Sequence, residues 1–353
     1  MKKIIKSNFI LLSLLALVGA FALTSCKDSD GSPDIKAGTP VLTSITPADP
    51  AGGDLVTVIG TGLGDMTSIV FAKGDVPATV VSTLNTEKCI LFRVPQSVNG
   101  GVQNVTFTNR NGKTMVASLD VQCPAQVVSV SDYNFTEGTE LTLTGYNFND
   151  VTSAVLTSTG TPVTIVSQTR NTMVIKMPAT TLSRTTIDLT NITGTTTTTQ
   201  EFVCYDNNFL VYTDAYGPGA FNGGIQNWGW GCTVGEVTST FKNGTKCLKV
   251  TYTDGGLSLW LGSDTWSTGH WFTDYFTPAY LTFWAKAEGA AVSVTIGDDG
   301  PPGGETATAI VTIPADTWTY FKVDATTWKS TYGRINFKAK NATVAYDDII
   351  YVK

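Results

Sequence analysis

The residues best suited to recognise another molecule are tryptophans that lie among glycines and polar residues in the C-terminal part of the chain. Trp228 and Trp230 alternate with glycines, and Trp266 and Trp271 lie in a run of Ser, Thr, Asp and His. Flanking glycines favour loops, and a large apolar side chain in a polar loop lowers solubility unless it packs or binds. Indole rings stack on apolar ring faces such as those of sugars. These four residues therefore predict a platform for a glycan.

Two further aromatic residues are lesser candidates for this platform. Trp260 follows a Leu-Ser-Leu run and can face either side of a strand, and Tyr216 begins a glycine-rich segment. One tryptophan of each leading pair could instead close the end of a sandwich. Trp284 and Trp318 lie inside predicted strands and are expected in the core. Side chains that could bond sugar hydroxyls nearby are those of Asn222, Gln226, Asn227, Asp264 and His270.

The sequence offers little for catalysis. His270 is the only histidine, which excludes a His/Cys metal cluster and any Ser/His/Asp triad that needs another histidine. Glycoside hydrolysis needs only two carboxylates, and Asp298, Asp299 and Glu305 are close in sequence. They flank residues 300–304, a Gly-Pro-Pro-Gly-Gly run that predicts a solvated turn. We expect no enzyme, with a glycoside hydrolase as the less favoured alternative.

The supporting elements of residues 205–353 are all predicted strands, because no stretch has sustained helical periodicity. About nine strands in about 150 residues suit a two-sheet jelly roll. The predicted strands are Phe209–Thr213, Cys247–Thr253, Leu257–Gly262, Tyr280–Lys286, Ala291–Ile296, Ala307–Ile313, Trp318–Val323, Arg334–Ala339 and Thr343–Val352. Residues 244–250, 281–286, 317–321 and 346–349 resemble the scaffold of carbohydrate-binding jelly rolls of the galactose-binding-like type.

That resemblance implies one cofactor. Many jelly rolls of this type hold a structural Ca²⁺ between the first and last strands. Asp214 follows the first predicted strand, and Asp347 and Asp348 lie in the last. Carboxylate oxygens suit Ca²⁺, but three carboxylates fall short of its 6–8 ligands, so backbone carbonyls would have to contribute. The alternative is that these carboxylates face solvent.

The front half of the chain repeats itself with an offset of 85 residues. Residues 55–60 match 140–145, and residues 66–71 match 151–156, in short alternating runs typical of half-buried strands. Residues 44–63 resemble the opening of an IPT/TIG domain. The resemblance implies two immunoglobulin-like sandwiches, at 38–123 and 124–204, that act as a rigid spacer without a glycan platform. The five threonines of 195–199 are read as an edge strand, with a linker as the alternative.

The N-terminus resembles a bacterial lipoprotein signal. Lysines and a short apolar run, too short for a membrane span, precede Cys26, so residues 1–25 are expected to be cleaved and Cys26 lipidated. The alternative is a plain secretory signal with a chance cysteine. Residues 26–37 are polar and acidic, which predicts a flexible tether. An acidic run behind the lipidated cysteine resembles the surface-export signal of Bacteroidota lipoproteins.

Charge and cysteine content restrict the partners. Removing residues 1–25 takes away three lysines and no acid, so the formal charge falls from -6 to -9. An acidic chain argues against nucleic acid. Five cysteines remain besides Cys26, an odd number that precludes complete internal pairing. Cys232 and Cys247 could bridge neighbouring strands in an oxidising compartment, and the other three are expected to be buried small apolar residues.

The order of these parts resembles the surface glycan-binding proteins of polysaccharide-utilisation systems. The resemblance implies a non-catalytic lipoprotein at the outer membrane that captures a plant-type polysaccharide, β-glucan or xyloglucan. It also implies an outer-membrane glycan transporter complex as partner, and a membrane contact through the lipid anchor only. A structural or adhesive surface lipoprotein is the alternative from another functional class.

Overall fold

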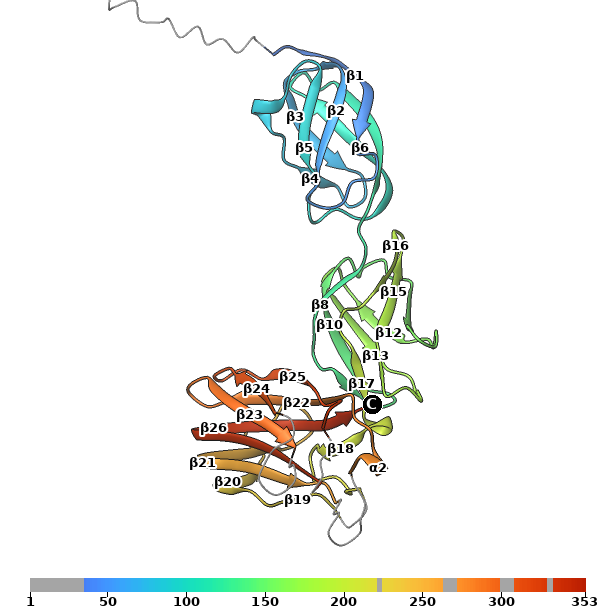
Figure 1. The fold of residues 1–353 in the computed structure, drawn as a ribbon. Coiled ribbons are helices and arrows are strands. Elements are labelled where there is room, and N and C mark those ends of the chain that lie inside the picture. The colour runs from blue at the N-terminus through green and yellow to red at the C-terminus, as the bar shows by residue number, and fades with distance from the viewer. Residues whose placement is uncertain (1–34, 221–223, 263–271, 299–307, 329–332) are drawn as a thin grey trace, which may run out of the picture. The chain divides into compact units, whose positions relative to one another are not determined.

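The computed structural model describes residues 35–220, 224–262, 272–298, 308–328 and 333–353. The predicted signal peptide, Cys26 and most of the predicted tether lie outside these ranges. The chain divides into two compact units, with the division between Cys123 and Pro124. Within the described ranges the only α-helix is the four-residue α2 (Phe272–Tyr275), so the all-β prediction is confirmed (Figure 1). None of the described helices has the length and apolar character that a membrane span requires.

The first unit is a β-sandwich of two antiparallel sheets, ordered β1-β2-β5 and β4-β3-β6-β7. In β2, Val56 and Val58 are fully buried while the residues between and beside them are more exposed, as the alternation predicted. Phe92 of β5 packs edge-on against Phe71 and Phe107 of the other sheet, which joins the two layers. The strands are β1 (Ala37–Thr46), β2 (Leu55–Leu63), β3 (Met66–Phe71), β4 (Val76–Ala78), β5 (Cys89–Arg93), β6 (Gly101–Asn109) and β7 (Thr114–Val121).

The second unit begins with another sandwich, built on the same pattern. Leu141 and Leu143 of β10 are buried at the positions that match Val56 and Val58. Strand β16 lies at the edge of the sheet β11-β15-β16, so residues 195–197 of the threonine run form an edge strand as expected, and Thr198 and Thr199 follow its end. The strands are β8 (Gln126–Val130), β9 (Asn134–Phe135), β10 (Glu140–Tyr146), β11 (Ser153–Leu156), β12 (Thr164–Gln168), β13 (Thr172–Lys176), β14 (Arg184–Thr185), β15 (Ile187–Asn191), β16 (Gly194–Thr197) and β17 (Phe202–Cys204).

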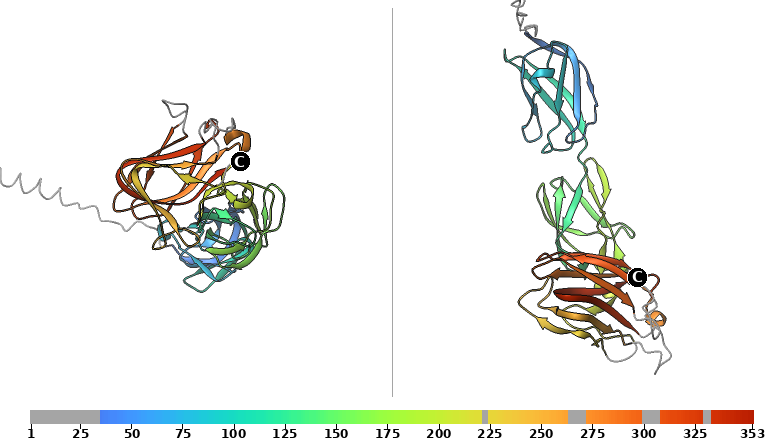
Figure 2. Two further views of the ribbon diagram at one scale, coloured as in Figure 1. Left: turned by 90° about the horizontal axis from the view of Figure 1, so that it is seen from below. Right: turned by 60° about the vertical axis from the view of Figure 1, so that its left-hand side comes forward.

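The second unit ends in a larger β-sandwich, whose strands run from yellow at β18 to red at β26 (Figure 1 and Figure 2). Two long strands, β21 (Cys247–Trp260) and β26 (Arg334–Val352), organise it, because β26 pairs with β18, β21, β22 and β23. Each of the two was expected as a pair of shorter strands. The other strands are β18 (Phe209–Tyr212), β19 (Gln226–Asn227), β20 (Trp230–Val237), β22 (Tyr280–Ala287), β23 (Val292–Asp298), β24 (Thr308–Ile313) and β25 (Thr319–Asp324).

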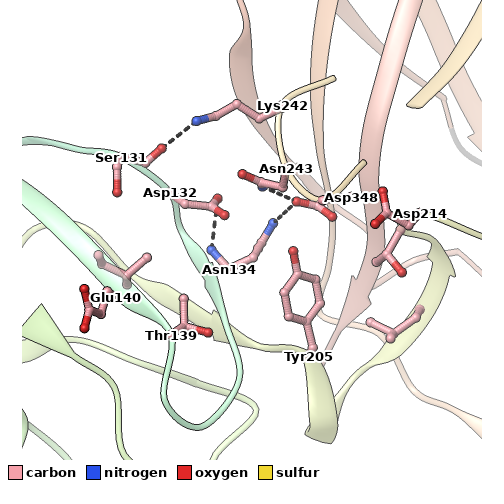
Figure 3. A pocket seen from close by; sticks show the side chains of 14 residues that line it. Ser131, Asp132, Asn134, Thr139, Glu140, Tyr205, Asp214, Lys242, Asn243 and Asp348 are labelled. Carbon is pink, nitrogen blue, oxygen red and sulfur yellow. Dashed lines mark hydrogen bonds between the residues drawn. The ribbon is translucent and has the colours of Figure 1, made fainter. Parts of the chain in front are cut away.

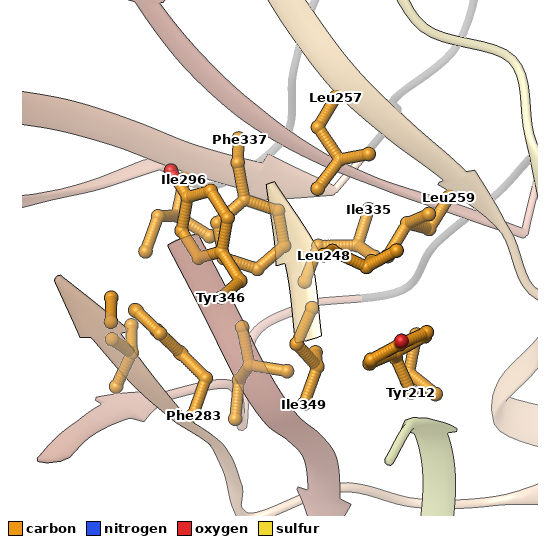
Figure 4. Packing of buried hydrophobic residues seen from close by; sticks show 14 of the residues in the cluster. Tyr212, Leu248, Leu257, Leu259, Phe283, Ile296, Ile335, Phe337, Tyr346 and Ile349 are labelled. Atoms are coloured by element: carbon orange, nitrogen blue, oxygen red, sulfur yellow. The ribbon is translucent and has the colours of Figure 1, made fainter. Parts of the chain in front are cut away.

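The core of this sandwich is continuous and aromatic. Phe337 of β26 packs edge-on against Phe283 of β22, with ring centroids 5.3 Å apart, and lies 5.0 Å from the ring of Tyr346. Leu257 and Leu259 of β21 lie beside them in the same cluster (Figure 4). Complete burial of these side chains is the main source of stability in the domain.

The disulfide considered between Cys232 and Cys247 is absent, since the five described cysteines are free thiols. In the β20–β21 pair, Cys232 lies opposite Tyr252, whereas Cys247 lies opposite Val237. The two cysteines are therefore separated by five residues along the ladder, farther apart than a disulfide allows.

Candidate functional site

The candidate site is one face of the C-terminal sandwich, formed by the first half of β26 and the second half of β21. Successive side chains of a strand point to opposite faces. Leu257, Leu259, Ile335 and Phe337 point into the core. The residues between them therefore lie on the other side, which we call the outer face. It comprises Gly256, Ser258 and Trp260 of β21 and Arg334, Asn336 and Lys338 of β26, with Trp228 and Trp230 resting on it.

Trp228 and Trp260 form the first aromatic element of the outer face. The two indoles stack in parallel, with ring centroids 5.3 Å apart and an interplanar angle of 4°. Trp260 is 8% exposed and Trp228 is 50% exposed, so Trp260 is the buried ring on which the exposed Trp228 ring packs. The Trp228 Nε1–H donates to Gln226 Oε1 at 3.1 Å, and the Arg334 guanidinium lies 5.7 Å from the Trp228 ring centroid. Stacking and the hydrogen bond hold an indole in place with half its surface open.

Trp230 forms the second aromatic element. It is 46% exposed and begins β20, opposite Gly256 of β21. A Cβ atom at Gly256 would lie 3.2 Å from the Trp230 Cη2 atom, so the indole extends over the bare backbone of this glycine. Lys338 Nζ lies 5.4 Å from the Trp230 ring centroid, within cation–π range. Gly231 has a φ of +58°, a left-handed conformation that glycine adopts without strain, and it lies at the irregularity in strand pairing between Trp230 and Cys232.

The structure places the other predicted platform residues elsewhere or does not describe them. Tyr216 is partly buried and packs edge-on against Tyr212 of the core, with centroids 5.3 Å apart, away from the outer face. Trp266 and Trp271 lie outside the described residues, as do Asp264 and His270. Trp328 is buried in the core.

Sequence analysis missed four polar residues of the outer face: Ser258, Arg334, Asn336 and Lys338. A signal for three of them is present, because residues 334–338 alternate polar and apolar. That alternation predicts a strand with one polar and one apolar face. It does not predict that tryptophans from other parts of the chain lie against the polar face.

A second candidate is a cavity of about 610 Å³ where the second sandwich meets the C-terminal one (Figure 3). It is lined by carboxylates and amides, including Asp132, Asn134, Asp214 and Asp348. Burial and the neighbouring Asp348 raise the pKa of Asp132 to about 6, and burial and Asp348 raise the pKa of Asp347 to about 7. Of the described residues that line it, Tyr205 is the only aromatic one. One ring is a smaller stacking surface than the two exposed indoles of the outer face.

The carboxylates expected to bind calcium do not fit that role. Asp347 accepts hydrogen bonds from the backbone N–H groups of Lys242 and Asn243, and Asp214 accepts them from Thr245 and Lys246. Asp348 accepts them from the side-chain amides of Asn134 and Asn243. The described part of the chain contains no group of three acidic, His or Cys side chains placed to hold a metal ion. Four of their six oxygens accept hydrogen bonds from N–H groups, which compete with a cation for these oxygens.

These groups instead connect the second sandwich to the C-terminal one. Trp284, expected in a sandwich core, is buried at this junction and donates its Nε1–H to Asp132 Oδ1 at 3.0 Å. Tyr133 stacks on Tyr320 with centroids 4.2 Å apart. A bulge in β26, where Asp348 has a φ of +47°, accompanies the burial of two successive carboxylates there.

The raised pKa values predict that the stability of the second unit falls as pH rises. Between about pH 4 and pH 7 the folded chain keeps protons on Asp132 and Asp347 that the unfolded chain releases. Calorimetry of the mature chain should show its melting temperature decreasing from pH 5 to pH 7.5. Asp132→Asn keeps the acceptor for Trp284 and should flatten this dependence. An unchanged pH profile in that variant would contradict the assignment.

Comparison with known proteins adds the family of the front half. The IPT/TIG domain family matches residues 40–122 and 125–203. No curated protein matches the chain. Among solved structures, the surface glycan-binding protein PbSGBP-B from Prevotella bryantii is 15% identical, with 90% of this chain and 100% of that chain covered and a TM-score of 0.51.

Two other solved structures are less similar. SGBP-B from a complex xyloglucan utilization locus in Bacteroides uniformis is 15% identical over 90% of this chain and 100% of that one, with a TM-score of 0.42. A CBM29-2 carbohydrate-binding module is 20% identical over 40% of this chain and 89% of the module, with a TM-score of 0.28. Residues 40–122 and 125–203 thus match the IPT/TIG domain family, and 90% of the chain shares the fold of PbSGBP-B.

Proposed function

We propose that this chain is a non-catalytic surface lipoprotein that binds polysaccharide on the outer face of its C-terminal sandwich. The observation that carries the proposal is the pair of half-exposed indoles, Trp228 and Trp230, fixed on one face of a rigid sheet. Large apolar rings that are held half-exposed on one face are typical of a surface that binds another molecule. The fold shared with PbSGBP-B supports the same class of function.

The composition of the outer face favours binding over hydrolysis. Its polar side chains are those of Ser258, Arg334, Asn336 and Lys338, which bear hydroxyl, amide and cationic groups. Hydrolysis of a glycosidic bond needs two carboxylic acids at a defined separation. Among the described residues that define this face none is a carboxylic acid. A ligand can stack and form hydrogen bonds here, but these residues cannot cleave it.

We infer a plant-type polymer, β-glucan or xyloglucan, as the ligand, and a glycan transporter of the outer membrane as the partner. Both follow from the resemblance of the module order to surface glycan-binding proteins. In this arrangement the IPT/TIG domains separate the binding face from the lipid anchor. The glycan is held until the transporter takes it up.

Native affinity electrophoresis tests the function directly. Gels that contain xyloglucan or mixed-linkage β-glucan should retard the mature chain, relative to a polysaccharide-free gel. A reducing-sugar assay on the same polymers should show no release. Absence of retardation by any polysaccharide would favour the structural or adhesive alternative, and release of reducing ends would favour the hydrolase.

Anchoring is tested separately through the proposed lipidation site. Cys26→Ala removes the thiol to which the lipid would be attached, so we expect the variant to lose stable membrane association. Fractionation of cells that express each form measures this. External protease should digest the wild-type chain on intact cells, and protection from the protease would contradict surface exposure.

A further inference from the structure

Two polar side chains on the outer face are buried, and each has an oxygen atom without a hydrogen-bond partner. Ser258 is 0% exposed and Asn336 is 3% exposed, and neither Ser258 Oγ nor Asn336 Oδ1 has a hydrogen-bond partner. They belong to different strands but lie directly opposite each other in the β21–β26 ladder. A buried polar atom without a partner costs roughly 1–3 kcal/mol, and native structures contain few of them. Two adjacent ones require an explanation.

The position of this pair supplies one. Gly256, two residues before Ser258, lies under the Trp230 indole, and Trp260, two residues after it, supports the Trp228 indole. At ~3.3 Å per residue these two positions are ~13 Å apart along the strand, with Ser258 midway. On the other side of Asn336 its partner in β23 is Gly297, which has no side chain. The pair therefore lies between the two aromatic elements, beside bare backbone.

We infer that Ser258 and Asn336 form a hydrogen-bonding subsite for a sugar hydroxyl of a chain that stacks on Trp228 and Trp230. This inference rests on the proposed function. A hydroxyl group can donate to Asn336 Oδ1 and exchange a hydrogen bond with Ser258 Oγ, so one sugar oxygen satisfies both. Stacking by itself accepts any apolar ring face, whereas a hydroxyl-binding pair rejects sugars that place no hydroxyl there. The indoles supply affinity, and this pair selects among glycans.

In the free protein the unsatisfied pair lowers stability, so removing the two polar atoms should affect stability and glycan binding in opposite directions. Ser258→Ala and Asn336→Leu remove the polar atoms and keep similar volume. In the double variant the melting temperature should stay the same or rise, because two buried unsatisfied groups are gone. Its Kd for xyloglucan or mixed-linkage glucan oligosaccharide, whichever polymer retards the wild type, should weaken by about 10-fold.

A matched control comes from the same two strands. Thr251 and Thr343 are also direct partners in the β21–β26 ladder, with hydroxyl oxygens 3.3 Å apart, but they lie beyond the tryptophans. Changing both to alanine should leave the Kd unchanged. The single variant Ser258→Ala serves as a second test in case Asn336→Leu disturbs the sheet. It removes only one oxygen and should weaken binding about threefold.

The outcomes separate this inference from the proposed function. If the double variant binds like the wild type while Trp230→Ala loses binding, the subsite is refuted and the platform stands. A lower melting temperature with unchanged Kd in both variants would show that the pair holds an internal water instead. If no polysaccharide binds the wild type, the proposed function itself fails.

Discussion

Replacing Trp228 and Trp230 together with alanine is expected to weaken polysaccharide binding by ~100-fold or more. By analogy with base–aromatic stacking, each stacked ring contributes ~1–3 kcal/mol, and ~1.4 kcal/mol corresponds to a factor of ten in Kd. Both indoles are about half exposed, so their removal leaves the core intact. Isothermal titration with the oligosaccharide that the wild type binds measures the effect, alongside the melting temperature.

Loss of exposed aromatic surface in general must be distinguished from loss of the platform. Tyr146 of the second sandwich is 53% exposed and Phe241 of the C-terminal domain is 41% exposed, and neither is on the outer face. Alanine at both positions should leave the Kd unchanged. A folded Trp228/Trp230 variant with wild-type affinity would place the platform elsewhere, with Trp266 and Trp271 as the remaining sequence candidates.

The largest expected effect on stability comes from Phe337→Ala. The Phe337 ring is fully buried beneath the outer face and contacts Phe283 and Tyr346. Truncating a buried phenylalanine costs ~3–5 kcal/mol, through lost burial and the cavity that remains. Its strand neighbours are Asn336 and Lys338, so we expect weakened glycan binding together with a large drop in the melting temperature.

The first unit provides the matched control for this substitution. Phe107 is likewise fully buried and packs against Phe92 in the core of the first sandwich. Phe107→Ala should destabilise that sandwich to a similar extent and leave the Kd unchanged, because the first unit forms its own core. Loss of glycan binding in the Phe107 variant would contradict the assignment of the binding face to the second unit.

The sequence determined the class of fold and the exposure of two of the tryptophans proposed as a platform, because both depend on local patterns. Alternation in residues 55–60 and 140–145 requires half-buried strands, and the offset of 85 residues identifies two copies of one sandwich. Tryptophans beside glycines remain exposed for a similar local reason, and Trp228 and Trp230 are about half exposed. Local pattern also misled at Trp230, which begins β20 although its glycines predicted a loop.

Only the tertiary structure decided which residues meet. Whether Trp260 faces the core or the ligand side depends on register, and the structure pairs it with Trp228. Ser258 meets Asn336 through a strand pairing that spans nearly eighty residues of sequence, and Trp284 is buried against another domain. Sequence periodicity predicts that a side chain is buried, but it does not identify the residues that pack against that side chain. Long-range pairing of β21 with β26 therefore assembled the outer face from residues that no local pattern connects.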